Sequence, residues 1–399
     1  MKLNEVVMRN KKELGMYVHI PFCKQKCNYC DFVSYCNKDY LIEEYMKWLI
    51  LELKEATGGI ELGREYKADE PVEISTIYIG GGTPSYIPSK YIKEMVKTIR
   101  KEYPLINRDI ETTIEVNPGT VNNEKLQDYF TAGINRLSIG MQAMQNKLLH
   151  TLGRIHTVED FLQTYHIARK IGFSNINIDI MFGLPDQTMA DLEETIRKGI
   201  ELQPEHISLY SLSIEEGTKF DVMEKEGKLN LPSEELERRM YWKAKEILEE
   251  AGYVHYEISN FAKEGFFSQH NMDCWNQKEY MGFGVSAHSY TDGMRFSNIE
   301  SVEEYIENNE NEMEENNEIF HEEQTKQSMM KEYMMLGLRK LEGISKEAFF
   351  KKFEEDLFIL FQKEIGKLEE KELVEIQEEN VRLTKKGLDF ANVVFAEFI

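Results

Sequence analysis

The sequence lacks long apolar runs, so nothing in it indicates a membrane-spanning segment. No stretch of about 18 consecutive apolar residues occurs in the 399-residue chain. Residues 1–15, MKLNEVVMRNKKELG, also lack the apolar core of a secretory signal peptide. The apolar content of 41% is nevertheless sufficient for a substantial hydrophobic core. We therefore expect a folded cytoplasmic protein that makes at most transient contact with a membrane.

Positive charge is scarce as well. The chain has 48 Lys and Arg against 71 Asp and Glu, which gives a formal net charge of −23. A surface this acidic repels phosphate backbones and anionic lipid on average. The composition therefore argues against a nucleic acid as a partner.

Cysteine is rare, and its distribution argues against a secreted disulfide framework. The chain has five cysteines, an odd number, and three of them fall within Cys23–Cys30. Disulfide-rich secreted domains use an even set that is spread along the chain. Tight clustering in a chain of this kind favours metal binding instead.

Residues 16–252 alternate between short β-rich runs and amphipathic helical stretches. The predicted strands are Met16–Ile20, Ser75–Ile79, Glu111–Val116, Arg136–Gly140, Asn175–Met181 and His206–Leu212. The predicted helices are Lys38–Glu55, Ser89–Tyr103, Asn122–Ala132, Val158–Ile171, Met189–Leu202 and Ser233–Ala251. Successive strand–helix units imply a parallel sheet with right-handed crossovers, either doubly wound or barrel-like. Polar motifs follow the strand ends, so we favour an α/β partial (β/α)6 barrel, TIM-like but open, with one shared mouth.

The rest of the chain divides into an N-terminal segment, 1–15, and three C-terminal regions. Residues 253–299 lose the helical period and predict extra strands and loops that flank the barrel. Residues 300–324 are rich in Glu and Asn and predict a solvated helix or acidic linker. Residues 325–399 predict a small helical, winged-helix-like domain whose hairpin turns at Glu378–Asn380. Such domains often bind DNA, but the acidity of this chain favours a packing role.

The three clustered cysteines follow the first predicted strand, in the segment CKQKCNYC. Thiolates hold iron–sulfur clusters, usually four to a [4Fe–4S] cluster. Cys23, Cys27 and Cys30 would therefore leave one iron free to bind a small molecule. A structural zinc site is the alternative, but it needs a fourth Cys or His. His19 is close in sequence, although strand alternation does not obviously direct it toward the loop.

Other residues at the strand ends have the chemistry to hold such a molecule. The glycines of Gly80–Pro84 lack Cβ atoms, so a ligand can approach the backbone closely. Glu115 can pair with an ammonium group, and Arg154 can grip a carboxylate with two hydrogen bonds. Asp179 interrupts an apolar strand and is costly to bury unless it is paired, for example with ribose hydroxyls.

CxxxCxxC followed by GGGTP resembles the radical S-adenosylmethionine superfamily. The resemblance implies a [4Fe–4S] cluster on the three cysteines, with S-adenosylmethionine on the open iron and an adenosyl radical formed on reduction. Within the superfamily the chain resembles the HemN-like family of oxygen-independent coproporphyrinogen dehydrogenases, including at YEISNFA (256–262) and YMGFGVSAHSY (280–290). By that resemblance the residues that contact S-adenosylmethionine are Tyr17, Gly81, Gly82, Thr83, Glu115, Gln142, Arg154 and Asp179.

Two departures from the dehydrogenases favour the branch of HemW-type haem chaperones. Phe32 occupies the position where dehydrogenases carry a further cysteine, and only a short segment precedes the cluster motif. The sequence HNMDCW (270–275) is similar to the HNxxYW motif of the chaperones, with Cys274 in place of the tyrosine. His270 and Cys274 are thus candidate haem ligands, although the motif favours a hydrogen-bonded turn beside the barrel with Trp275 in the core.

This branch implies haem as cargo, a haem-accepting protein and an electron donor as partners, and leaves a homodimer open. The alternative function is that of the dehydrogenases themselves, a radical decarboxylation in porphyrin biosynthesis. The S-adenosylmethionine contacts are the same in both, so they do not separate the two functions.

Overall fold

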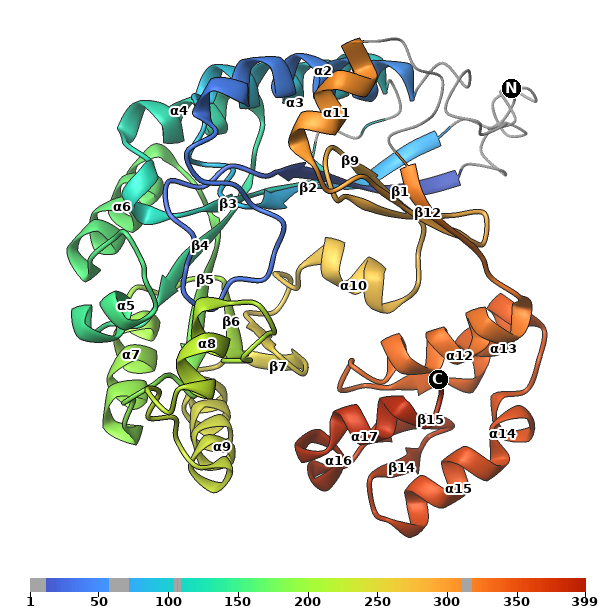
Figure 1. Cartoon of the computed structure of the whole chain (residues 1–399). Helices are drawn as coiled ribbons and strands as arrows, with labels where there is room; N and C mark the ends of the chain where they lie inside the picture. The colour runs from blue at the N-terminus through green and yellow to red at the C-terminus, as the bar shows by residue number, and fades with distance from the viewer. Residues whose placement is uncertain (1–11, 57–71, 104–105, 107–108, 311–317) are drawn as a thin grey trace.

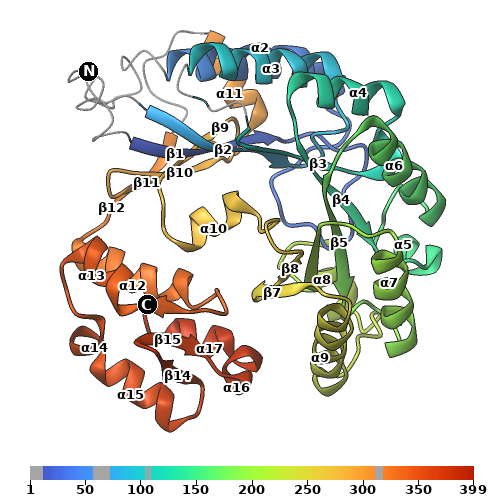
Figure 2. The same cartoon turned by 180° about the vertical axis from the view of Figure 1, so that it is seen from behind.

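The computed structural model describes residues 12–56, 72–103, 106, 109–310 and 318–399 (Figure 1). The predicted segment 1–15 and the predicted acidic linker 300–324 therefore lie partly outside the described residues. A 12-stranded sheet forms the centre of the fold, in the order β12-β11-β10-β9-β1-β2-β3-β4-β5-β6-β8-β7. It curves into an open horseshoe, with most of its helices on the outer side (Figures 1 and 2).

The middle of the sheet is the predicted series of parallel strand–helix units, which is confirmed. Its strands are β1 (Lys12–Ile20), β2 (Val72–Gly81), β3 (Glu111–Val116), β4 (Arg136–Gln142), β5 (Asn175–Phe182) and β6 (His206–Ser211). The covering helices are α2 (Ile42–Glu55), α3 (Ser89–Glu102), α4 (Asn123–Ala132), α6 (Val158–Ile171), α7 (Met189–Glu201) and α9 (Glu234–Glu250). Short helices η1 (Asp39–Leu41), η2 (Pro118–Thr120), α5 (Asn146–Thr151) and α8 (Lys219–Lys225) lie in the connections.

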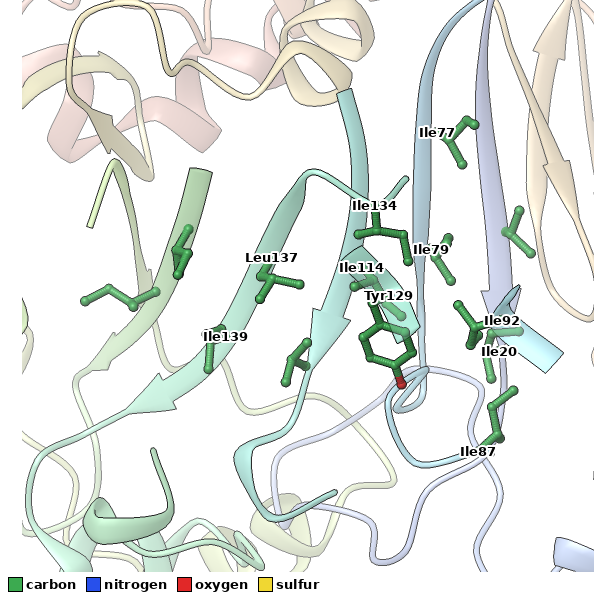
Figure 3. Packing of buried hydrophobic residues seen from close by; sticks show 14 of the residues in the cluster. Ile20, Ile77, Ile79, Ile87, Ile92, Ile114, Tyr129, Ile134, Leu137 and Ile139 are labelled. Atoms are coloured by element: carbon green, nitrogen blue, oxygen red, sulfur yellow. The ribbon is translucent and has the colours of Figure 1, made fainter. Parts of the chain in front are cut away.

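The outward face of the strands is apolar and holds the helices. Figure 3 shows Ile79 of β2, Ile114 of β3 and Ile139 of β4, with Ile92 of α3 and Tyr129 of α4 packed among them. All five side chains are fully buried. Because side chains alternate along a strand, the residues between these isoleucines point into the horseshoe.

The inward face is polar. Thr76 and Tyr78 on β2, Glu115 on β3, Ser138 on β4 and Asp179 on β5 share this face. The apolar outer face of the sheet therefore packs against the helices, and the polar inner face is free to form a site.

Residues 253–299 extend the sheet at both of its edges instead of one. The hairpin β7 (Val254–Glu257) and β8 (Asn260–Ala262) adds to β6. Strand β9 (Tyr280–Phe283) pairs in parallel with β1, and β10 (His288–Thr291) and β11 (Met294–Asn298) follow it.

Between the two sets of strands the chain forms α10 (Gln269–Trp275), inside the horseshoe (Figures 1 and 2). The expectation of strands and loops alone was wrong at this point, because a helix of two turns is too short to show its period.

The acidic region contributes to the packing more than a solvated linker would. Helix α11 (Val302–Glu310) buries Val302, Tyr305 and Ile306, and the Tyr305 hydroxyl donates to Glu52 of α2 at 2.5 Å. Strand β12 (Glu318–Glu323) pairs with β11. Several of the Glu and Asn residues therefore belong to the outer side of packed elements.

The C-terminal region forms a small domain with its own core. Its elements are α12 (Lys326–Gly337), β13 (Ile344–Ser345), α13 (Lys346–Phe353), α14 (Leu357–Leu360), α15 (Gln362–Glu370), β14 (Val374–Gln377), β15 (Asn380–Leu383), α16 (Lys385–Asp389) and α17 (Ala391–Ala396). The strands form a sheet in the order β13-β15-β14. Glu378 and Glu379 both have positive φ, as a two-residue hairpin turn requires, so the predicted hairpin is confirmed. None of the helices in the described part of the chain combines the length and apolar character needed to cross a bilayer.

Candidate functional site

A cavity of about 460 Å³ opens at the carboxyl ends of β1–β6. Parallel α/β folds place their sites at this end of the sheet. The cavity brings together ten of the eleven residues predicted for the cluster and for S-adenosylmethionine: Cys23, Cys27, Cys30, Gly81, Gly82, Thr83, Glu115, Gln142, Arg154 and Asp179.

The cysteine loop is held on both sides by backbone hydrogen bonds. The amide of Cys23 donates to Tyr35 O at 2.9 Å, which closes the loop on itself. Asn28 fixes the middle of the loop: its amide donates to Leu152 O at 2.9 Å and its Nδ2 donates to Thr151 O at 2.8 Å. The three thiols thus face the cavity from an anchored loop.

The thiols have neighbours suited to a cluster. Cys23 Sγ lies 3.3 Å from Thr83 Oγ1, and burial raises the pKa of Cys23 to about 11. Burial also raises the pKa of Cys30. Arg154 Nη1 donates to Cys27 Sγ at 3.7 Å and brings a positive charge to the site. Because thiols bind metal as thiolates, cluster assembly here releases protons.

The three thiols of the loop match the donor set of a [4Fe–4S] cluster that keeps one iron open. A zinc ion needs its ligands about 2.0–2.3 Å from one point. In a [4Fe–4S] cluster each thiolate binds a different iron, so the ligands surround the cluster.

The glycines of the cavity leave space that a side chain would fill. A Cβ at Gly82 would lie 3.1 Å from Cys23 Sγ, and one at Gly140 would lie 2.8 Å from Arg154 Nη2. Gly81 has φ +115, which other residues rarely adopt. The lack of side chains lets a ligand reach the backbone between the cysteines and Arg154.

Two carboxylates face the cavity. Glu115 accepts hydrogen bonds from Tyr78 Oη at 2.9 Å and from the Gly81 amide at 3.2 Å. Asp179 accepts from Asn177 Nδ2 at 2.8 Å and from Ser138 Oγ at 3.3 Å. Burial raises the pKa of Glu115 to about 7, and it also raises the pKa of Asp179. A cationic ligand would stabilise both ionised carboxylates.

Gln142 and Arg154 complete the polar wall. Gln142 has φ 64, a left-handed conformation, and its buried Oε1 has no hydrogen-bond partner in the structure. An unpartnered buried oxygen is costly unless a ligand donates to it. Arg154 Nη2 donates to Gly140 O at 3.2 Å, which holds the guanidinium beside the cavity. The residues therefore fit a ligand with both donor and carboxylate groups.

Tyr17 is the predicted contact that does not line the cavity. Its ring stacks on Tyr78 with centroids 6.3 Å apart, and its hydroxyl lies 3.0 Å from His19 Nδ1. Tyr78 lines the cavity in its place, together with Ser138 and Tyr210, none of which was predicted. The signal was available for Ser138, because it stands two residues before the cavity glycine Gly140 on the same strand.

The HNMDCW motif forms α10, below the cavity and not at its lining. His270 is buried: its ring stacks on Tyr78 at 5.1 Å, and its Nδ1 lies 2.9 Å from Thr76 Oγ1. Burial lowers the pKa of His270 to about 4 and raises that of Cys274 to about 12. The guanidinium of Arg339 lies 4.4 Å from the Trp275 ring. Haem ligation by His270 or Cys274 stays a prediction.

Family models match two parts of the chain. The model of the radical SAM superfamily matches residues 17–199, and the model of the HemN C-terminal domain matches residues 324–390. Among solved structures, coproporphyrinogen III oxidase (HemN) from Escherichia coli aligns with a TM-score of 0.82 at 21% identity. The alignment covers 99% of this chain and 92% of that one, so the two share a fold.

Relatives match over most or nearly all of the chain. Heme chaperone HemW of Bacillus subtilis is 38% identical, over 96% of this chain and 98% of its own. Heme chaperone HemW of Lactococcus lactis is 35% identical, over 98% of both chains. HemW of Escherichia coli is 37% identical over 69% of each chain. The chain therefore belongs to the HemW family of the radical SAM superfamily.

Proposed function

We propose that this protein is a cytoplasmic haem chaperone that binds haem and transfers it to a haem-dependent protein. The observation that carries the proposal is the similarity along the full length to proteins named heme chaperone HemW, at 38% identity for the Bacillus subtilis protein. The cavity supports the S-adenosylmethionine part of the proposal, because ten of the eleven residues predicted for the cluster and the ligand line it.

The [4Fe–4S] cluster would be held by Cys23, Cys27 and Cys30. S-adenosylmethionine would occupy the open iron and the cavity beside it. Arg154 suits the carboxylate of the ligand, because a guanidinium offers paired donors. Glu115 suits the ammonium group, and Asp179 suits the ribose hydroxyls. A reduced cluster with bound S-adenosylmethionine supplies one-electron cleavage of the sulfonium, with electrons from a donor protein.

The residues of this chain bind and orient the ligand and exclude water from it. The anchored loop fixes the three thiols, and the glycines at 81, 82 and 140 allow close contact with the backbone. Glu115, with its pKa near 7, holds a proton when the site is empty below that pH. It gives up that proton when an ammonium group arrives, so ligand binding near pH 6 is accompanied by proton release.

The coproporphyrinogen dehydrogenase function is the weaker alternative. The likeness to HemN is one of fold, at 21% identity. Phe32 is 65% exposed at the rim of the cavity, where the dehydrogenases are expected to carry a fourth cysteine. Anaerobic incubation with coproporphyrinogen should therefore give no vinyl product.

Haem titration of the reconstituted protein tests the proposal. The full chain is purified anaerobically, its cluster is restored with iron and sulfide, and haem is added while the Soret band is followed. We expect a saturable shift of the Soret band and transfer of the haem to an apo-protein acceptor. Haem that passes through a desalting column separately from the protein would contradict the proposed function.

A further inference from the structure

We infer that α10 supports the wall of the S-adenosylmethionine cavity without lining it, and that its His270 is a positioning residue that acts on Glu115 through Tyr78. The inference rests on the proposed S-adenosylmethionine site. It gives the histidine of the HNMDCW motif a role within the barrel that does not depend on haem.

Helix α10 is fixed to the inner face of the sheet at its amino end. The two oxygens of Glu111, at the start of β3, accept from the amides of Gln269 and His270, each at 3.1 Å. Arg136 of β4 lies 3.9 Å from the same carboxylate and is 2% exposed. Ser75 Oγ of β2 donates to Asp273 Oδ2 at 3.3 Å. The helix is therefore held by side chains of β2 and β3, and Arg136 of β4 supports Glu111.

His270 sets the position of Tyr78. The tyrosine ring stacks on two others, His270 at 5.1 Å and Tyr17 at 6.3 Å. The Nδ1 atom of His270 lies 2.9 Å from Thr76 Oγ1, which fixes the plane of the imidazole. The two ring contacts restrict rotation of the Tyr78 side chain while α10 is in place.

Tyr78 in turn holds Glu115, the carboxylate proposed to meet the ligand ammonium. Its hydroxyl donates to Glu115 Oε1 at 2.9 Å and so favours the ionised carboxylate. The other groups that face Glu115 are the Gly81 amide, which also favours ionisation, and Asp179, which opposes it. Loss of the Tyr78 bond would leave the carboxylate protonated to higher pH and less well placed.

A second buried path joins α10 to Asp179. Asn177 donates to Asp179 Oδ1 at 2.8 Å, and its Oδ1 lies 2.6 Å from His206 Nδ1. His206 Nε2 lies 2.7 Å from Tyr256 Oη, which accepts from the amide of Ser268 at 3.3 Å. Ser268 directly precedes α10. Both cavity carboxylates are thus connected to the same short helix.

The test measures the affinity for S-adenosylmethionine by equilibrium dialysis on the reconstituted full chain. His270→Ala removes the stacked ring, and Tyr78→Phe removes only the hydroxyl. Each should weaken binding about tenfold, the size of one hydrogen bond to a charged group. His270→Phe keeps a flat ring against Tyr78 and should bind within about twofold of the wild type.

The control is His255→Ala, because His255 is also buried and stacks on an aromatic ring, Phe261, at 4.3 Å. It should bind S-adenosylmethionine as the wild type does. A wild-type affinity in His270→Ala, or an equal loss in His255→Ala or in His270→Phe, would overturn the inference. Failure of the wild type itself to bind S-adenosylmethionine would instead refute the proposed S-adenosylmethionine site.

The pH dependence separates positioning from general damage. Wild-type affinity should rise with pH through about 7 as Glu115 ionises. In Tyr78→Phe the rise should move to higher pH, whereas general damage would lower the affinity equally at every pH. The amino group of the ligand titrates identically with both proteins, so it cancels in the comparison. An unmoved pH profile in Tyr78→Phe would overturn the inference even if that variant bound more weakly.

Discussion

Two regions lie on the inner face of the horseshoe: the mouth, which is the cavity at the strand ends, and the floor, which is the contact of α10 with β2 and β3. They differ in whether their polar groups have hydrogen-bond partners within the protein. At the mouth, Gln142 Oε1 has no partner, and Glu115 has a pKa raised to about 7 by burial. On the floor, Glu111 accepts from two amides, and His270 meets Thr76. The polar groups of the mouth therefore need a ligand as their partner, whereas those of the floor are satisfied by other groups of the protein.

The largest expected effect comes from a substitution in the cysteine loop, at the mouth. Cys27→Ala should abolish the cluster and its absorption near 400 nm, because the remaining two thiols cannot replace a third ligand. Iron and sulfide analysis after anaerobic reconstitution measures how much cluster each protein holds. Cys36→Ala is the matched control, since Cys36 is a free cysteine close in sequence that does not line the cavity. A full cluster in Cys27→Ala would contradict the ligand assignment.

The raised pKa of Glu115 predicts how the stability of the ligand-free protein changes with pH. The folded-state pKa is about 7 and the unfolded value is 4.5, so between these the folded state holds a proton that the unfolded chain has lost. The free energy of unfolding should fall as pH rises from 4.5 to 7, by up to about 3 kcal/mol from this group. Urea unfolding of the wild type and of Glu115→Gln gives the difference. A difference between them that stays constant across this range would disagree with a buried carboxyl.

Glu115→Gln should have opposite effects on the stability of the protein and on its affinity for the ligand, as expected of a residue at the mouth. Glu115→Gln removes a buried charge, so we expect the ligand-free protein to be more stable at pH 8. It also removes the partner of the ligand ammonium, so the affinity for S-adenosylmethionine should fall by about 30-fold. Thermal unfolding and equilibrium dialysis measure the two effects. Glu124→Gln, on the exposed side of α4, should change neither.

Substitution of Glu111, on the floor, should lower the stability of the protein. Glu111→Gln leaves one of the two α10 amides without its carboxylate oxygen, so we expect a loss of about 1–2 kcal/mol in the free energy of unfolding. Glu264→Gln, exposed in the same part of the chain as α10, should stay within about 0.5 kcal/mol of the wild type. A Glu111→Gln protein as stable as the wild type would mean that α10 is not anchored as the hydrogen bonds indicate.

The sequence predicted the mouth well because its chemistry lies at strand ends. Strand β3 was predicted with the bounds that it has, and these bounds place Glu115 near its end. Parallel strands bring such ends together, so Cys23, Glu115 and Asp179 could be grouped without knowledge of the loops.

The floor could not be predicted in the same way. Helix α10 has seven residues, too few for a visible period, and it lies in the connection that runs from β8 beside β6 to β9 beside β1. The contact of His270 with Tyr78 joins residues 192 positions apart and depends on how the chain enters the horseshoe. The displacement of Tyr17 from the cavity by Tyr78 is likewise a matter of tertiary packing.

Electron paramagnetic resonance of the reduced, reconstituted protein tests the central claim most directly. Three thiolates should hold a cluster with four iron and four sulfide per chain, and one iron should be open to S-adenosylmethionine. The account predicts a spectrum of a reduced [4Fe–4S] cluster that changes when S-adenosylmethionine is added. A spectrum that is indifferent to S-adenosylmethionine, or a protein that retains zinc in place of iron, would contradict it.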